Sequence, residues 1–130
     1  LITPVLDMSM ENPLINKIES KDIMLSKSGV ISAKKMCAGL IELKSSIISP
    51  LYGSFKNFTP TYIFIGENDI MKPDAELFVE KLKKETIPVS VFKGDGMPHI
   101  WPLLPLLVEA KIALRQITDL IFASHQNKKS

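Results

Sequence analysis

The chain has 130 residues and a single cysteine, with a hydrophobic fraction of 45% and a charged fraction of 23%. This composition is typical of one folded globular domain and excludes a disordered or fibrous protein. The formal net charge of +2 is too small to indicate binding to nucleic acid or to an anionic membrane. No apolar run reaches the ~18 residues of a membrane span, and we expect a cytoplasmic protein.

The first quarter of the chain predicts a strand followed by an irregular segment. Leu1 to Leu6 is an apolar run of strand type, although Pro4 cannot donate a hydrogen bond to a sheet. Because the chain opens inside this run and without an initiator methionine, we expect that an N-terminal portion of the protein is missing. Residues 7–27 mix methionine, proline and charged residues, which predicts turns and one short helix.

A helix is predicted next, with Ser26 or Ser28 as its N-cap and Gly39 closing it in the left-handed conformation. Its expected buried face has the i, i+3, i+4, i+7 spacing of an amphipathic helix and consists of Ala33, Met36, Cys37 and Leu40. Cys37 is therefore expected to be a buried structural thiol. A lone cysteine excludes a disulfide within the chain and argues against a zinc site built on thiolates. Residues 45–60 read as loop.

The second half alternates strands with helices. Thr61–Ile65 is apolar on both faces, as in a central parallel strand, and Val89–Phe92 reads as the next strand. Between them Pro73 and Asp74 open a helix whose expected inner face is Ala75, Phe78, Val79 and Leu82. A long helix is predicted from Pro105 to about Ser124, with apolar residues at Leu107, Ala110, Leu114, Ile117 and Ile121, widened by Leu106, Ala113 and Leu120. This order predicts an α/β fold with a parallel sheet and right-handed crossovers.

Two loops follow the two predicted strands at the end of the sheet where ligands bind. The first contains Asp69 and the second contains His99, one helix-and-strand unit later. If the strands are neighbours, the Asp69 carboxylate can accept a hydrogen bond from the His99 Nδ1 and orient the imidazole as a base. Glycine and proline flank His99, and Met97 and Trp101 offer apolar walls beside it.

Simpler interpretations of these residues stay open. An aspartate after a strand is often a helix cap, and a loop histidine often only completes a hydrogen bond. Asp69 and His99 could also bind a metal, but no third ligand follows at a recognisable spacing, so neither a metal nor a cofactor is predicted.

The sequence resembles the hormone-sensitive-lipase-like branch of the α/β-hydrolases. Gly66 to Asp74, with the pattern G-x-x-D-x-x-x-P-D, is similar to the loop that holds the catalytic acid, and Gly96 to Trp101 is similar to the loop that holds the catalytic base. Leu1–Asp7 and Ser49–Gly53 are similar to segments that precede these loops in that family. The resemblance gives Asp69 the role of acid, His99 that of base, and Asp74 that of a structural carboxylate.

The resemblance implies the C-terminal portion of a three-layer α/β-hydrolase fold with an incomplete sheet. Residues 1–130 would form one segment of a single domain, with a lid-like excursion at 8–60 and the acid and base within 61–124. The implied function is hydrolysis of a carboxylic ester, with Met97, Ile100 and Trp101 contacting the small-molecule substrate. The G-x-S-x-G elbow and the HGGG-type loop of the family do not occur here, so the serine and oxyanion hole would lie upstream and this chain alone would be inactive. Ile70-Met71 also stands where an Asp-Pro-Leu-like run is more usual.

A second hypothesis is a binding or assembly module without chemistry of its own, or the remnant of a degraded hydrolase. A partial sheet leaves an open strand edge and an uncovered apolar face, both of which favour association. In the family that the sequence resembles, the last strand and the last helix often form a homodimer, so the resemblance makes Val89–Phe92 and the helix from Pro105 the predicted surface of a homodimer.

Overall fold

The computed structural model describes residues 1–126, with side chains to residue 124, and the chain forms two compact units, residues 1–99 and the part from Ile100 onward. The first unit contains helices α1 (Ile15–Ile18), α2 (Lys27–Ala38) and α3 (Lys72–Lys84), strands β1 (Thr61–Gly66) and β2 (Val89–Gly94), and the short helical turns η1 (Glu19–Lys21) and η2 (Pro50–Tyr52). The second unit contains the turn η3 (Trp101–Leu103) and helix α4 (Val108–Gln126).

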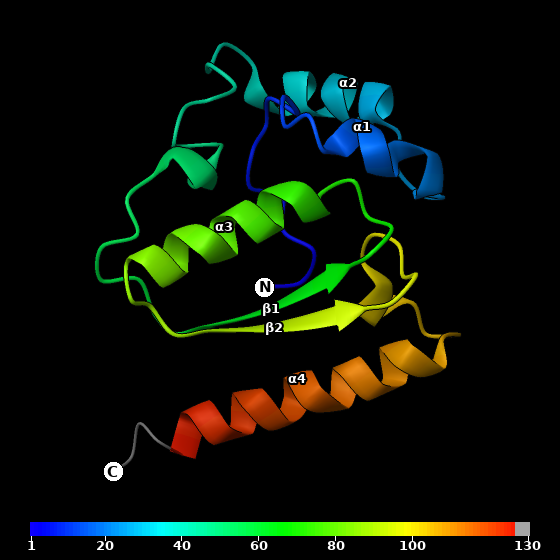
Figure 1. Ribbon diagram of the computed structural model, residues 1–130, viewed down its shortest axis with the longest axis vertical. Coiled ribbons are helices and arrows are strands. Elements are labelled where there is room, and N and C mark those ends of the chain that lie inside the picture. Colours follow the sequence, from blue (N-terminus) through cyan, green and yellow to red (C-terminus); the bar gives the residue numbers. More distant parts are fainter. Residues whose placement is uncertain (127–130) are drawn as a thin grey trace. The chain divides into compact units, whose positions relative to one another are not determined.

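The two predicted strands form a parallel pair, which confirms the expected α/β class with an open parallel sheet (Figure 1). The register runs from Thr61 opposite Val89 to Gly66 opposite Gly94, so both strands end at the same level. The rings of Phe64 and Phe92 stack across the pair, 4.6 Å apart. The loops that carry Asp69 and His99 therefore leave the sheet side by side.

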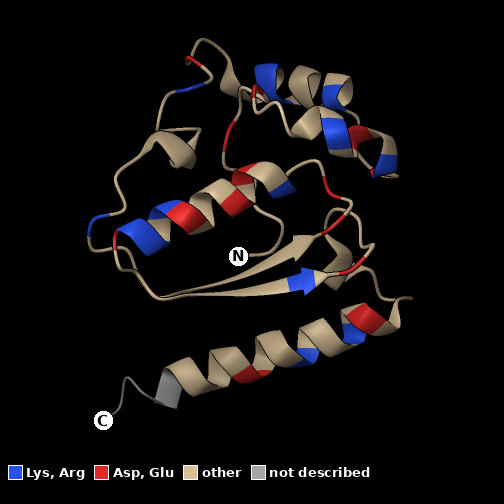
Figure 2. Cartoon of the chain, in the orientation of Figure 1, with Lys and Arg blue, Asp and Glu red and all other residues tan. Residues whose placement is uncertain are grey.

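Helix α3 connects the strands and packs its apolar face on them. Its predicted inner residues are all buried, and they join a core with Leu51, Phe55, Ile63 and Ile65. Phe78 meets Phe55 edge to face at 5.1 Å. Asp74 lies in the first turn of α3 and lysines occupy the last turn, so charges of both signs complement the helix dipole (Figure 2).

The predicted N-terminal strand is reduced to a single parallel bridge between Ile2 and Phe64. The Thr3 N–H donates to the Phe64 carbonyl at 2.9 Å, but Thr3 has a φ of 35°, which turns the chain out of the extended conformation. Pro4, which follows, has no N–H to continue the ladder. The prediction of a strand over Leu1–Leu6 is therefore wrong in extent, although the single bridge is parallel, as expected of this sheet.

Helix α2 begins where predicted, since the Ser26 hydroxyl accepts a hydrogen bond from the Gly29 N–H at 3.2 Å. Its predicted buried face is wrong: Ala33, Met36, Cys37 and Leu40 are all exposed. The inward face instead carries Lys34 and Ala38, because the Lys34 ammonium reaches inward to the Asp7 carbonyl and the Met10 sulfur. Cys37 is thus an exposed thiol, and Gly39 ends the helix with a φ of 57° but a ψ of −116°, outside the left-handed helical region.

The second unit consists largely of α4, which begins three residues later than predicted because residues 105 and 106 form a turn. Ala110 and Ala113 of the predicted stripe are buried, whereas Leu106, Leu114 and Ile121 are exposed. In the described part of the chain, no helix combines the length and the hydropathy that crossing a membrane would require.

Candidate active site

The loop after β1 holds Asp69 in a fixed position. The Asp69 side chain is 1% exposed, and its Oδ1 accepts a hydrogen bond from the Met71 N–H at 2.8 Å. Its backbone carbonyl accepts from the Lys72 N–H at 2.9 Å, which starts helix α3. Asp69 therefore closes the turn before α3 with one oxygen, and the other oxygen is left for a second partner.

The loop after β2 presses against the end of β1 at Gly66. A Cβ atom at position 66 would lie 2.5 Å from the Pro98 carbonyl oxygen and 2.6 Å from that of Met97, so only glycine fits there without movement. Gly96 provides the bend of this loop with a φ of 68°.

Besides the contact between Asp69 and His99, four hydrogen bonds join the two loops. The Glu67 N–H donates to the Gly94 carbonyl at 3.0 Å, and the Asn68 N–H donates to the Met97 carbonyl at 3.0 Å. The Asn68 side-chain amide donates to the Gly96 carbonyl, and the Gly96 N–H donates to the Glu67 carboxylate. The loops thus form one rigid corner of the sheet.

Asp69 and His99 meet in this corner, as the parallel topology predicts. The second carboxylate oxygen of Asp69 lies 2.9 Å from the His99 Nδ1, and the His99 side chain is 17% exposed. A carboxylate in this position holds a proton on Nδ1, which leaves Nε2 as the basic nitrogen. The pair can therefore take a proton from a nucleophile and stabilise the imidazolium that results.

The residues predicted to contact substrate flank His99 in the sequence. Met97 is half-buried, and Ile100 is half-buried with a φ of 51°, an unusual conformation for a β-branched residue. Trp101 begins η3 and is 5% exposed. A backbone outlier directly after a candidate base is the kind of local strain that is often found at functional sites.

Sequence reasoning missed Asp22, which contacts the acid loop. Its Oδ2 accepts a hydrogen bond from the Ile70 N–H at 2.9 Å, and its Oδ1 accepts from the N–H groups of Met24 and Leu25, also at 2.9 Å. The local turn has a recognisable pattern, an aspartate that bonds to the backbone two residues on. The contact with Ile70 spans 48 residues, and no local pattern could have indicated it.

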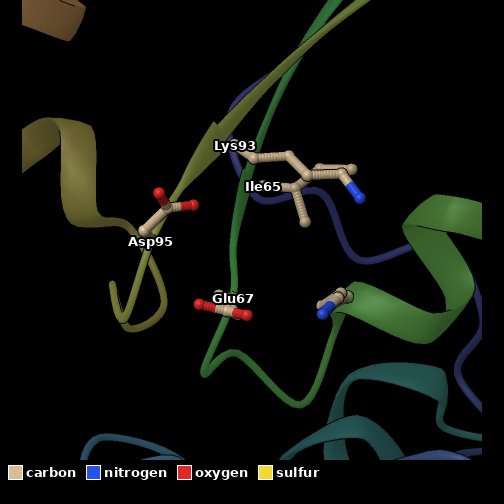
Figure 3. A pocket seen from close by; sticks show the side chains of 5 residues that line it. Ile65, Glu67, Lys93 and Asp95 are labelled. Carbon is tan, nitrogen blue, oxygen red and sulfur yellow. The ribbon is translucent and has the colours of Figure 1, made fainter.

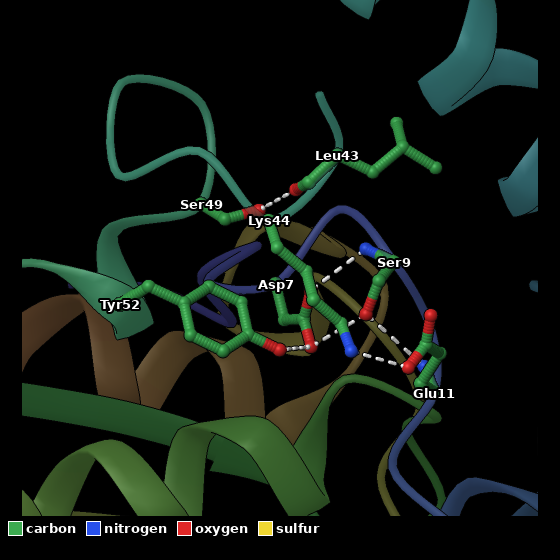
Figure 4. A network of polar contacts seen from close by, with 7 residues as sticks. All are labelled: Asp7, Ser9, Glu11, Leu43, Lys44, Ser49 and Tyr52. Atoms are coloured by element: carbon green, nitrogen blue, oxygen red, sulfur yellow. Dashed lines mark hydrogen bonds and ion pairs between the residues drawn. The ribbon is translucent and has the colours of Figure 1, made fainter. Parts of the chain in front are cut away.

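A polar network around Asp7 was missed as well (Figure 4). The Asp7 carboxylate accepts hydrogen bonds from the Tyr52 hydroxyl at 2.8 Å and from the Ser9 N–H and hydroxyl, while Lys44 pairs with Glu11 nearby. Through Asp7, this network links Ser9, near the start of the excursion at residues 8–60, to Tyr52, near its end.

Two buried charges lie close to this network. Asp74 is 2% exposed and its Oδ1 accepts from the Asn12 side-chain amide at 2.8 Å. Burial raises the pKa of the Asp74 carboxyl above its usual 3.8, and the Asn12 hydrogen bond opposes this. Burial lowers the pKa of Lys34 below its usual 10.5, opposed by the charges of Asp74 and Asp7. Asp74 also lines a cavity of about 300 Å³ with Asp7 and Tyr52.

A small pocket lies at the carboxyl end of the strands (Figure 3). Glu67 and Asp95 line it together with Ile65, Lys72 and Lys93. Its volume of about 60 Å³ is well below the size of pockets that bind organic ligands. Within the described residues, no group of three or more His, Cys, Asp or Glu side chains could hold a metal ion.

Two curated proteins are similar in sequence to this chain. Versiconal hemiacetal acetate esterase of Dothistroma septosporum is 36% identical over 62 residues, which are 48% of this chain and 19% of that protein. Triacylglycerol lipase of Mycobacterium tuberculosis is 27% identical over 92 residues, 68% of this chain and 21% of that protein. The chain thus spans about a fifth of the length of these relatives.

A solved structure of a hormone-sensitive lipase from a metagenome library superposes with a TM-score of 0.87 at 19% identity, covering 94% of this chain and 42% of that one. The expected resemblance to the hormone-sensitive-lipase-like hydrolases is confirmed. The family model described as the alpha/beta hydrolase fold matches residues 1–103, and the chain therefore belongs to the α/β-hydrolase-fold family.

Proposed function

We propose that this chain supplies the acid and the base of a Ser-His-Asp triad in a carboxylic ester hydrolase. Asp69 is the acid, His99 is the base, and the nucleophilic serine and oxyanion hole lie upstream of Leu1. The observation that carries the proposal is the 2.9 Å contact between the buried Asp69 carboxylate and the His99 Nδ1. The names of the two relatives, an acetate esterase and a triacylglycerol lipase, support an ester as substrate.

The proposed reaction has two halves. In the first, the serine hydroxyl attacks the ester carbonyl while the His99 Nε2 takes its proton, and the imidazolium then gives that proton to the departing alcohol. In the second, His99 takes a proton from water as the water attacks the acyl-serine, and returns the proton to the serine as the acid leaves. Asp69 stabilises the imidazolium in both halves and does not itself take the proton.

The other parts of the chain would serve the same site. We assign the acyl pocket to the excursion at residues 8–60, with residues 61–124 carrying the acid and base. Met97, Ile100 and Trp101 would contact the substrate, supported by their positions within two residues of His99 in the sequence. Without the serine and the oxyanion donors, residues 1–130 alone should not turn over an ester, because those donors usually contribute the largest catalytic term.

The test uses the full-length polypeptide, meaning these residues together with the coding sequence upstream of Leu1. We expect it to hydrolyse p-nitrophenyl butyrate with saturation kinetics, and His99→Ala to lower kcat by about 10³-fold or more. Glu80→Gln, on the exposed side of α3, is the control and should retain wild-type turnover. Unchanged turnover in His99→Ala would exclude His99 as the base.

A homodimer is a second candidate role, favoured by a specific observation. Within the described residues, β2 pairs with β1 on one side and with no strand on the other, so its outer edge can accept a further strand. Independently, α4 exposes Val108, Ile112 and Phe122. We propose that Val89–Phe92 and α4 each contribute to dimer contacts, and sedimentation velocity of the full-length polypeptide tests this. A monomer at all concentrations would contradict the dimer.

A further inference from the structure

The geometry points to Asp22 as a positioning residue that holds the catalytic acid loop from the excursion at residues 8–60. The inference rests on the proposed function of Asp69 and His99 and adds a role for a segment assigned above only to the acyl pocket. It follows from three sets of contacts between this segment and the residues that come directly after Asp69.

The first contact is made by the Asp22 carboxylate, whose two oxygens have separate tasks. Oδ1 accepts from the Met24 and Leu25 N–H groups and folds the loop of Asp22 itself. Oδ2 reaches across to the Ile70 N–H at 2.9 Å. The Asp22 side chain therefore stabilises its own local turn and also accepts a hydrogen bond from Ile70, the residue next to Asp69.

This tie completes a series of three amides at the entrance to α3. The Ile70 N–H donates to Asp22, the Met71 N–H to the Asp69 carboxylate, and the Lys72 N–H to the Asp69 carbonyl. Ile70 is 0% exposed, so its amide cannot turn to bulk water for another acceptor. Without Asp22 the loop has to move to satisfy that amide, and Asp69 moves with it.

The second set of contacts is apolar. The side chains of Ile70 and Met71 are buried in a cluster with Met10 and Ile15, against which further residues of the excursion pack: Ile18, Leu25, Val30 and Ile31. The excursion therefore holds the side chains of the acid loop as well as its backbone. The hydrogen bond to Asp22 also requires an N–H at position 70, which isoleucine has and proline would lack.

The third contact lies one turn further along, where the Asn12 amide donates to the Asp74 carboxylate at 2.8 Å. All three contacts join residues 8–31 to residues 70–74. Together they predict that the orientation of Asp69 depends on residues 8–31, and that the orientation of His99 depends on them through Asp69. These residues do not themselves take part in the contact between the Asp69 carboxylate and the His99 imidazole.

Asp22→Asn separates the two tasks of the carboxylate. The asparagine Oδ1 can still accept from Met24 and Leu25, but its NH₂ group cannot accept from the Ile70 N–H. The matched control is Glu80→Gln, an exposed carboxylate on α3, which changes the net charge by the same amount. Asp22→Ala removes both tasks and shows the effect of losing the local turn as well.

The readouts are amide hydrogen exchange and ester turnover in the full-length polypeptide. Asp22→Asn should speed exchange at Ile70 by about 10- to 100-fold and lower kcat by a similar factor, with KM within about twofold of wild type. Faster exchange with unchanged kcat would make Asp22 merely structural and would overturn the inference, as would unchanged exchange at Ile70. If the wild type has no turnover, the proposed function fails. The inference about Asp22 is then decided by the exchange rate of the His99 Nδ1 proton. Faster exchange in Asp22→Asn supports the inference, and unchanged exchange overturns it.

Discussion

Replacing Gly66 with alanine should separate the loop of the base from the end of β1. The added Cβ would lie 2.5 Å from the Pro98 carbonyl oxygen and 2.6 Å from that of Met97. Since Cβ contacts below 3.0 Å are essentially never seen, the loop must retreat by at least about 0.5 Å. The atoms that would have to yield are backbone, only one and two residues before His99.

The cost of this change follows from two effects. Overpacking at a tight backbone contact typically costs about 1–3 kcal/mol. Movement of Met97 also weakens the hydrogen bond from the Asn68 N–H to the Met97 carbonyl, which contributes about 1 kcal/mol. We therefore expect Gly66→Ala to lower the free energy of unfolding by about 2–4 kcal/mol.

Urea unfolding of the full-length polypeptide measures this loss, with Gly29→Ala as the matched control. Gly29 lies inside α2, and its added Cβ would meet only the Ser26 hydroxyl, at 3.0 Å. Because alanine favours a helix but its Cβ crowds the Ser26 hydroxyl that caps α2, this control should change the unfolding free energy by no more than about 1 kcal/mol in either direction. Equal unfolding free energies for Gly66→Ala and wild type would refute the close approach of the two loops.

Three further predictions concern the polar interior. Burial raises the pKa of Asp74, so the folded protein binds more protons than the unfolded chain between pH 3.8 and the raised pKa, and stability falls as pH rises through that window. Asp74→Asn should flatten this part of the curve of unfolding free energy against pH, and a slope as steep as that of wild type would contradict the prediction. Burial lowers the pKa of Lys34, so the unfolded chain binds more protons between the lowered pKa and pH 10.5, and stability rises with pH toward that value. Lys34→Met should abolish this rise in the unfolding free energy, measured by urea unfolding at alkaline pH. A rise that persists in the variant would show that another group causes it. Tyr52→Phe removes the hydroxyl that donates to Asp7 at 2.8 Å and should lower the unfolding free energy by about 1–2 kcal/mol, whereas no loss would mean that this bond contributes nothing to stability.

The elements of the second half could be predicted because their local patterns agree with their packing. Thr61–Ile65 and Val89–Phe92 are strongly β-forming, and the proline, aspartate and apolar spacing of α3 indicate both its start and its buried face. Parallel pairing then follows from the crossover helix, and it brings Asp69 and His99 to the same edge. The contact of the candidate pair was thus predictable from topology.

The excursion could not be predicted equally well because long-range polar contacts decide its structure. The apolar spacing in α2 indicated the face of Met36 and Leu40, yet the face that is buried carries Lys34 and Ala38. A lysine at an inward position contradicts the usual preference for exposure, and only its partners Asp7 and Met10, more than twenty residues away, explain it. The hydrogen bond from Ile70 to Asp22 escaped prediction for the same reason.

The central claim is that Asp69 holds the His99 imidazole in one tautomer, and ¹H–¹⁵N NMR of the imidazole in the full-length polypeptide tests it most directly. At a pH where His99 is neutral, we predict a slowly exchanging proton on Nδ1 and an unprotonated Nε2, with the Nδ1 proton signal moving upfield in Asp69→Asn. A neutral ring protonated on Nε2, or an Nδ1 signal that Asp69→Asn leaves unchanged, would contradict the account.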